Sequence, residues 1–450
     1  MPLHRRTLLS ACLAAATTLT GCRDQAASPA AEPAPGATPD ARAAATTSPR
    51  AAAASTPAGG TAAMGAAGAT KPSGHELRLT AELTRHLKPT MENPKHPGYA
   101  GAVALCQVNG QVIARSTVGK ALLYGAGPVL LPEWKQVAMR HDSIFDIASV
   151  TKVFTAILAL QQVDKGHLDL AAPVVRYLPG FTGAGKEAVT VAMLLAHTSG
   201  LPIGAKVTGL ANDAARRAAV LATPLIKDAV PGTVFRYSSV GLMITAQLVE
   251  KVTEQRLDQA LKTGLTGPLG LRSTGFNPNA WLSSTDRANR LAATDARSSR
   301  GLLRGVVHDD VANHLGGVAG HAGIFSTAAD LAIIGQLLLN GGTYNGRRIL
   351  SDAMTRRMLA NANAGLPAID PERPNRTSAH GLGVVLNQPW FMGKLATPRA
   401  FGHTGFTGTS LLVNPDRKMV LVLLTNRAHP NWSWADPDPV RVAVANICAS

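Results

Sequence analysis

Strand-like segments lie near both ends of this 450-residue chain, and the segments between them have helical character. In the central part, apolar residues recur at helical spacing, and about 200–300 is expected to be mostly helical. Asn109-Gly110 marks a hairpin turn within the first strand-like segment. The predicted strands span 101–118, with that turn inside it, then 381–386, 401–413 and 419–425. This order predicts an α/β fold of the α+β kind, with an antiparallel sheet built from both chain ends, flanking helices and an adjoining all-α lobe.

The first 22 residues have the pattern of an export signal. Arg5 and Arg6 precede an apolar segment that is too short to remain as a membrane-spanning helix. This segment ends at Leu19-Thr20-Gly21-Cys22, which favours a lipobox with Cys22 as the lipidated residue. An ordinary cleaved signal with an incidental cysteine is the alternative. We expect a lipid-anchored protein of the bacterial cell envelope that faces the periplasm.

Residues 23–75 are rich in Ala, Pro, Thr, Ser and Gly and have almost no large apolar side chains. Such a segment cannot bury enough surface to offset the entropy cost of ordering, so it is predicted to be a disordered tether. The folded domain is expected at 76–450, beginning with a helix over about 76–88. A second helix is predicted at 326–340, capped by Ser326 or Thr327.

The chain is basic, with 44 Lys and Arg against 28 Asp and Glu and a net charge of +16. The basic residues are spread out, without blocks or interleaved aromatic residues, so no nucleic-acid partner is expected. The oligomeric state stays open. Cys106 and Cys448 are expected in the folded domain, either paired in an oxidising envelope or as two buried thiols.

Ser149 and Lys152 stand three residues apart at the start of a strongly apolar segment, residues 153–160. On a helix this spacing places the hydroxyl and the amine on one face, one turn apart. The amine can then take the proton of the hydroxyl, which makes a serine nucleophilic. Taken alone, the pair also fits a serine that caps the helix and a lysine in solvent.

Further motifs accompany this pair: Tyr237 within 231–239, His403-Thr404-Gly405 near the C-terminus, and 197–201, which reads His-Thr-Ser-Gly-Leu. With residues 145–152 they resemble the motifs of the serine β-lactamase and penicillin-binding-protein superfamily. Their order and spacing are similar to those of class C β-lactamases, low-molecular-weight DD-peptidases and related esterases. The resemblance covers about 76–450 and implies a β-lactamase/transpeptidase-like fold.

The resemblance implies a role in acyl transfer for each motif. Ser149 would attack a carbonyl and become acylated, and either Lys152 or Tyr237 would take its proton, a choice that stays open. The backbone N–H groups of Ser149 and Phe406 would stabilise the oxyanion. Gly405 would leave room for the substrate backbone beside its strand.

Substrate-binding positions depart from the family pattern. Ser239 stands where many members have an asparagine, and His403 where class C β-lactamases have a lysine. A histidine is only partly charged near neutral pH, so weaker β-lactam turnover is expected, with acylation intact. Thr404 is expected to orient a substrate carboxylate, and His321 to face the cleft.

The remaining histidines are predicted to be structural. His197 is expected to cap a helix end, and His308 and His314 to have packing roles. Together with Asp309 and His321, their spacing matches no known metal site, so no metal is expected.

These residues predict a serine hydrolase that forms an acyl-enzyme on an ester or amide and needs no metal, nucleotide or other cofactor. The predicted substrate is a D-alanyl peptide derived from peptidoglycan, as for a DD-carboxypeptidase. The alternatives are an esterase for other small molecules, a class C-like β-lactamase, and a sensor that stays acylated without turnover. Substrate specificity is expected to lie in loops such as 204–230 and 361–380.

Overall fold

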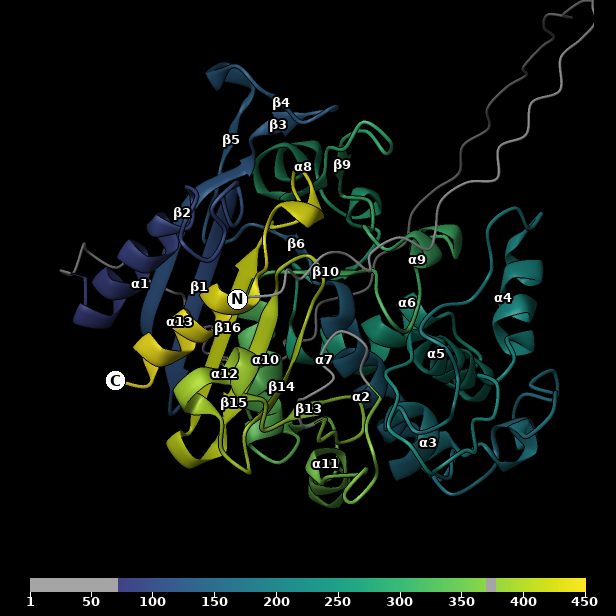
Figure 1. Cartoon of the computed structure of the whole chain (residues 1–450). Helices are drawn as coiled ribbons and strands as arrows, with labels where there is room; N and C mark the ends of the chain where they lie inside the picture. Colours follow the sequence, from purple (N-terminus) through teal and green to yellow (C-terminus); the bar gives the residue numbers. More distant parts are fainter. Residues whose placement is uncertain (1–71, 370–377) are drawn as a thin grey trace, which may run out of the picture. The chain divides into compact units, whose positions relative to one another are not determined.

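The structure, a computed structural model, describes residues 72–369 and 378–450 (Figure 1). The predicted signal at 1–22 and nearly all of the predicted tether lie outside the described residues. Helix α1 (Gly74–Arg85) begins slightly before the predicted domain start, because the Ser73 side chain accepts a hydrogen bond from the Glu76 N–H. Among the described residues, no helix is both long and apolar enough to cross a bilayer.

Within these residues, one antiparallel sheet of seven strands has the order β13-β14-β15-β16-β1-β2-β5. Its strands are β1 (Gly101–Val108), β2 (Gln111–Leu122), β5 (Val137–Ala138), β13 (Val385–Leu386), β14 (Phe401–Thr404), β15 (Ser410–Asn414) and β16 (Met419–Thr425). At its centre β1 pairs with β16, and Ala102 lies opposite Thr425. The prediction of a sheet built from both chain ends is confirmed.

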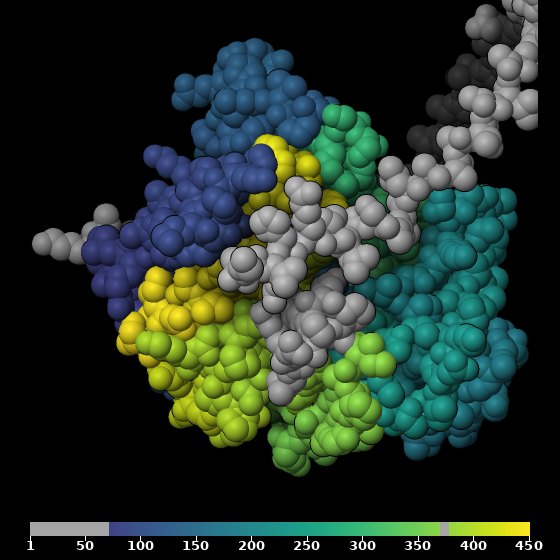
Figure 2. Space-filling view, in the orientation of Figure 1, coloured from purple at the N-terminus to yellow at the C-terminus, as the bar shows by residue number. Residues whose placement is uncertain are grey.

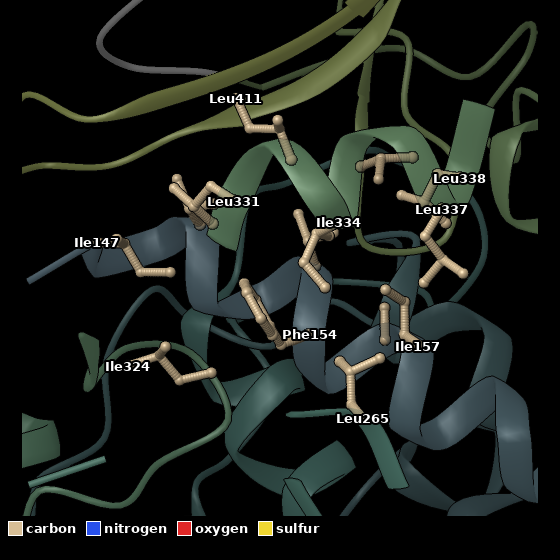
Figure 3. Packing of buried hydrophobic residues seen from close by; sticks show 14 of the residues in the cluster. Ile147, Phe154, Ile157, Leu265, Ile324, Leu331, Ile334, Leu337, Leu338 and Leu411 are labelled. Atoms are coloured by element: carbon tan, nitrogen blue, oxygen red, sulfur yellow. The ribbon is translucent and has the colours of Figure 1, made fainter. Parts of the chain in front are cut away.

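The central strands bury both of their faces. On β16, alternate residues face two different clusters of apolar side chains, as the two-residue period of a strand requires. One cluster includes α1 and α13 (Asp438–Cys448), and the other includes α2 (Thr151–Asp164) and α10 (Ala328–Leu339). Figure 3 shows Phe154 and Ile157 of α2 packed near Ile334 and Leu337 of α10. Helix α2 is therefore buried almost all round, as its apolar sequence predicts.

A helical lobe adjoins the sheet and is coloured mostly teal in Figures 1 and 2. It contains α3 (Val191–Leu195), α4 (Asp213–Ala222), α5 (Ser239–Thr253) and α6 (Leu257–Leu261). Helix α5 packs against α2 and so joins the lobe to the sheet region. The expectation that 200–300 is mostly helical holds only in part, because long irregular segments precede α4 and α5 and follow α8 (Ser284–Arg290).

Short elements make up much of the rest of the described chain. They are β3 (Tyr124–Gly125), β4 (Val129–Leu130), β6 (Phe145–Asp146), α7 (Gly267–Leu269), β7 (Gly275–Phe276), β8 (Ala293–Asp295), β9 (Leu303–Arg304), α9 (Asp310–His314), β10 (Ile324–Ser326), β11 (Thr343–Tyr344), β12 (Arg347–Arg348), α11 (Asp352–Leu359) and α12 (Pro389–Met392). Of the two predicted caps for α10, it is Thr327 that accepts the Asp330 N–H.

The prediction of one strand over 401–413 is wrong, because a tight turn at 405–409 separates β14 from β15. Gly408 in this turn has φ +98°, a conformation that favours glycine. The predicted strand at 381–386 is also too long, since only Val385–Leu386 joins the sheet. Cys106 and Cys448 are buried free thiols, so the open question of their pairing is answered for this structure.

Candidate active site

The Ser149 turn, residues 145–150, links β6 to α2. Ala148 in this turn has φ +46°, a left-handed conformation that costs an alanine roughly 1–2 kcal/mol. The buried Asp146 carboxylate stabilises it, because Oδ1 accepts the Ala148 N–H at 2.8 Å. Ser149 lies in a short 3₁₀ turn (Ala148–Val150) directly before α2. Its hydroxyl therefore stands at the N-terminal end of a buried helix, where the helix dipole favours negative charge.

Lys152, in the first turn of α2, is fully buried and reaches Ser149. Its Nζ donates to Ser149 Oγ at 2.9 Å and to the backbone carbonyl of His321 at 3.0 Å. The same Nζ lies 5.0 Å from the centroid of the Tyr237 ring. The alternative of a lysine in solvent is therefore wrong. An amine held in this way can exchange a proton with the serine hydroxyl.

Tyr237 comes from the helical lobe, two residues before α5. Its ring packs on the His197 ring with centroids 4.6 Å apart. His197 Nδ1 accepts the Ser238 N–H at 3.1 Å, so any proton on a neutral ring is at Nε2. Burial lowers the His197 pKa well below its usual value, which leaves the ring uncharged. His197 thus has a structural role, as predicted, and it positions Tyr237 beside Lys152.

His403 lies on β14 and is only 3% exposed. Its Nδ1–H donates to the Thr404 carbonyl at 2.7 Å, so Nε2 carries the lone pair. Burial, together with the nearby charge of Lys152, lowers the His403 pKa to about 3. The prediction of a partly charged histidine at this position is therefore wrong. At neutral pH the ring carries no charge, and its Nε2 is buried without a hydrogen-bond partner among the described residues.

The Gly405 turn, residues 405–409, packs directly against the Ser149 turn. Thr407 Oγ1 donates to the Asp146 carbonyl at 2.7 Å, and Thr409 Oγ1 donates to the Ile147 carbonyl at 3.0 Å. A Cβ atom on Gly405 would lie 2.4 Å from the Ile147 carbonyl oxygen. Glycine is thus required for the two turns to approach each other, a reason additional to the room for substrate expected from the sequence.

The Phe406 N–H, one of the two predicted oxyanion donors, makes no backbone hydrogen bond within the described part of the chain. Because hydrogen bonds join the two turns, the N–H groups of Phe406 and Ser149 are held in place relative to each other. Arg441 of α13 stabilises the Gly405 turn, since its Nη2 donates to the carbonyls of Gly405 at 2.7 Å and Thr409 at 3.0 Å. No sequence motif indicated this arginine.

Two other predicted substrate-binding residues lie on the elements that carry this site. Thr404 ends β14 and is half-buried, directly before the Gly405 turn. Ser239 begins α5, and its N–H donates to the Ile203 carbonyl at 3.2 Å. In the described residues no hydrogen bond joins Ser239 to Lys152. The amine is oriented instead by the His321 carbonyl.

The His321 side chain does not face the cleft as predicted, because its ring is only 2% exposed and lies against Asp309. Its Nε2 lies 3.0 Å from Asp309 Oδ1. Although burial opposes it, the His321 ring holds the pKa of that carboxyl well below its usual range. This hydrogen bond stabilises the segment whose carbonyl accepts from Lys152. Within residues 72–369 and 378–450, no three side chains of His, Cys, Asp or Glu come together as a metal site.

Two cavities in the described residues lie apart from these groups. One, of about 450 Å³, is lined by residues of α4 and α9, among them Arg216 and His314. The other, of about 620 Å³, lies between the β1–β2 turn and α10. Neither is lined by Ser149, Lys152 or Tyr237. The candidate site is identified here by its hydrogen bonds.

Comparison with known proteins agrees with this geometry. The Beta-lactamase family profile matches residues 83–446. An N-acetylmuramyl-L-alanine amidase of Bacillus subtilis (strain 168) is 30% identical over 378 residues, which are 78% of this chain and 82% of the relative. A "Putative D-alanyl-D-alanine carboxypeptidase" of Escherichia coli (strain K12) is 31% identical over 365 residues, 74% of this chain and 79% of the relative.

Solved structures share the fold. A penicillin-binding protein homolog from Caulobacter crescentus is similar over 84% of this chain and 97% of its own, with a TM-score of 0.58 and 20% identity. That likeness is evidence for the architecture alone, a large antiparallel sheet flanked by helices. The family profile covers most of the chain, and the amidase and the carboxypeptidase named above are both hydrolases. This chain belongs to the beta-lactamase family.

Proposed function

We propose that this protein is a serine hydrolase that cleaves an ester or amide through an acyl-enzyme on Ser149. The observation that carries the proposal is the 2.9 Å hydrogen bond between Lys152 Nζ and Ser149 Oγ, with the Tyr237 ring against the same amine. A buried amine bonded to a serine hydroxyl at a helix N-terminus is suited to activate that hydroxyl. The named relatives, an amidase and a carboxypeptidase, support the same reaction class.

In the proposed reaction, Ser149 Oγ bonds to the substrate carbonyl carbon while its proton passes to the base, which is either Lys152 as a neutral amine or Tyr237 as a phenolate. The carbonyl oxygen becomes an oxyanion near the N–H groups of Ser149 and Phe406. When the carbonyl re-forms, the bond to the leaving amine or alcohol breaks, and the leaving group takes the proton. Water then attacks the acyl-enzyme in the same way, which releases the acid and regenerates the Ser149 hydroxyl.

The proposed substrate is a peptide from peptidoglycan. The names of the two curated relatives refer to different amide bonds, one after N-acetylmuramyl and one between two D-alanines. A D-alanyl peptide ends in a free carboxylate, and a hydrogen bond from a cation to that group is worth roughly 1.5–3 kcal/mol. The neutral His403 ring supplies no such cation, so this position does not favour a terminal carboxylate.

Hydrolysis of small esters is the second candidate, and the same observation about His403 favours it, because an ester needs no carboxylate-binding cation. β-Lactams also carry a carboxylate, and the uncharged His403 provides no cation for it. They are therefore expected to acylate Ser149 and to turn over slowly. A sensor that stays acylated would give one equivalent of product and then stop.

Labelling tests the proposed acyl-enzyme. A fluorophosphonate probe and a labelled penicillin are each incubated with the wild type, and the modified peptide is identified by mass spectrometry. We expect modification at Ser149 and none in Ser149→Ala. The wild type is also assayed with nitrocefin, p-nitrophenyl esters, a D-alanyl peptide and a muramyl peptide. Undiminished labelling or hydrolysis by Ser149→Ala would contradict the proposal, and single-turnover product would favour the sensor.

We further propose that the protein is a lipoprotein of the cell envelope, anchored through Cys22 and facing the periplasm. The support is the sequence pattern at 1–22, which lies outside the described residues. The wild type is expected in the membrane fraction, and Cys22→Ala in the soluble fraction or as an unprocessed precursor. Recovery of the wild type entirely in soluble periplasm would rule out the anchor.

A further inference from the structure

An aromatic surface lies beside the proposed oxyanion donor. We name it the Phe406–Trp432 patch, and it consists of the rings of Phe406, Trp432 and His308 with the guanidinium groups of Arg427 and Arg297. The Phe406 ring is 47% exposed, and its centroid lies 5.5 Å from that of Trp432 and 5.4 Å from that of His308. The Arg427 guanidinium lies 4.9 Å from the Phe406 centroid, and that of Arg297 lies 6.0 Å from the Trp432 centroid.

Hydrogen bonds attach this patch to the Ser149 turn from two sides. The His308 N–H donates to Asp146 Oδ2 at 2.7 Å, and the other oxygen of that carboxylate holds the turn itself. On the opposite side, the Arg427 N–H donates to the Thr407 carbonyl at 3.1 Å, and Thr407 in turn donates to the Asp146 carbonyl. These hydrogen bonds hold the patch in place against the Ser149 turn.

The chemistry of the patch fits a sugar ring. A pyranose has an apolar face of C–H groups, whose hydrogens are attracted to the negative face of an aromatic ring. Its hydroxyl and acyl oxygens project from the ring edge, where the positive charge of the two guanidinium groups attracts them. Two aromatic rings flanked by two arginines therefore complement an N-acylated amino sugar better than they complement a purely aliphatic group.

The distance along the substrate from its sugar to each amide bond decides which bond can reach Ser149. Phe406 carries both the platform ring and the proposed oxyanion N–H, so a sugar stacked on it lies next to the reacting carbonyl. In a muramyl peptide, the lactyl carbonyl joins the sugar to the peptide, and it lies closer to the sugar than any carbonyl of the peptide itself. The D-alanyl–D-alanine bond lies several residues further along, and each extended residue adds about 3.3–3.6 Å. A stacked sugar thus excludes that distant bond from Ser149.

We propose that the Phe406–Trp432 patch is a subsite for the amino-sugar ring of a muramyl peptide, and that the amide between the lactyl group and the first amino acid is the bond cleaved. This proposal rests on the proposed acyl-enzyme function. The lactyl carbonyl carbon bonds to Ser149 Oγ, and its bond to the amino-acid nitrogen breaks as that nitrogen takes the proton. Water then releases the lactyl carboxylate. The uncharged His403 ring is compatible with a substrate that has no terminal carboxylate at this position.

Two matched substrates test the subsite: N-acetylmuramyl-L-alanyl-D-isoglutamine, and the same dipeptide acylated with lactic acid alone. Both contain the same scissile amide, and only the first contains the sugar. We expect the wild type to prefer the first by about tenfold or more in kcat/KM, and Trp432→Leu to reduce this preference by about tenfold, which corresponds to about 1.4 kcal/mol. Phe406→Leu keeps the backbone N–H and removes the ring, so it should reduce the preference in the same direction.

Trp134→Leu is the matched control, since Trp134 is 79% exposed and lies outside the patch. It should retain the wild-type preference. Thermal unfolding checks that each variant is folded. An equal kcat/KM for the two substrates in the wild type, or a preference that survives in both Trp432→Leu and Phe406→Leu, would overturn the subsite.

A binding measurement separates this proposal from the proposed function. N-acetylmuramic acid is titrated into Ser149→Ala, and tryptophan fluorescence is followed. A saturable change that Phe406→Leu weakens supports the subsite even if hydrolysis is not observed, because this variant keeps Trp432 as the fluorescent group. If the wild type is labelled at Ser149 while the sugar gives no change and no preference, the acyl-enzyme function stands and the subsite is wrong.

Discussion

The Ser149–Lys152 pair and the Phe406–Trp432 patch lie side by side but are built differently. Lys152 is fully buried and makes two directed hydrogen bonds, and the Asp146 carboxylate holds the turn before it. The patch is partly exposed, and its side chains meet through ring contacts about 5–6 Å between centroids. Proton transfer requires donor and acceptor within hydrogen-bond reach, whereas a stacking surface tolerates small shifts. The first region is therefore suited to the reaction, and the second to substrate selection.

The largest effect is expected from a substitution that disrupts the Ser149–Lys152 pair and leaves the Phe406–Trp432 patch intact. Lys152→Ala removes the group bonded to Ser149 Oγ and should lower kcat about a thousandfold on every substrate, sugar-bearing or not. Steady-state rates on a p-nitrophenyl ester and on the muramyl peptide give this number. Lys165→Ala, at the solvent-exposed end of the same helix, is the control and should keep wild-type rates. A loss confined to the sugar-bearing substrate would show that the two regions are not separable as described.

The next effect concerns stability and pH. Burial lowers the His403 pKa from 6.5 to about 3, so between these values the unfolded chain binds a proton that the folded chain does not. The free energy of unfolding should therefore fall as pH decreases from about 6.5 toward 3, with His403 contributing about 2 kcal/mol of the loss at pH 5. Urea unfolding of the wild type and of His403→Gln at pH 7.5 and pH 5 measures it. The variant should lose less stability than the wild type, and the surface variant His141→Gln should lose as much.

The smallest effect tests how the two regions are joined. Arg441→Met removes both hydrogen bonds to the Gly405 turn, which carries the proposed oxyanion N–H as well as the Phe406 ring. We expect kcat to fall about tenfold on esters and on muramyl peptides alike, with KM little changed. Arg441→Lys should restore part of kcat, and the exposed Arg417→Met is the control. A rise in KM without a change in kcat would place Arg441 with substrate binding instead of the turn.

Local patterns predicted the contact between Ser149 and Lys152. Ser149 and Lys152 meet because a three-residue spacing on a helix brings them together, whatever surrounds them. The structural role of His197 also followed from its place at a helix end. The sheet could be predicted because strand-like segments occur at both chain ends, where β1 and β16 in fact pair.

The remaining features depend on contacts between distant segments, which no short pattern encodes. The charge of His403 is set by its burial, and the break between β14 and β15 by the close approach of Gly405 to Ile147. The support from Arg441 and the contact between Phe406 and Trp432 join positions far apart in the sequence. In the sequence, the patch is marked by a phenylalanine directly after the His-Thr-Gly motif, and this residue indicates a surface only once the structure places Trp432 beside it.

The pairing of β1 with β16 also bears on how the chain reaches its native state. The two central strands of the sheet come from near opposite ends of the folded domain, so they can pair only after almost all of it has been synthesised. Contacts between such distant positions raise the contact order, and domains of high contact order fold slowly. Until β16 arrives, both β1 and the apolar faces that it later buries remain open to other chains. A chain that stops before residue 419 is therefore expected to aggregate instead of folding into a smaller active unit.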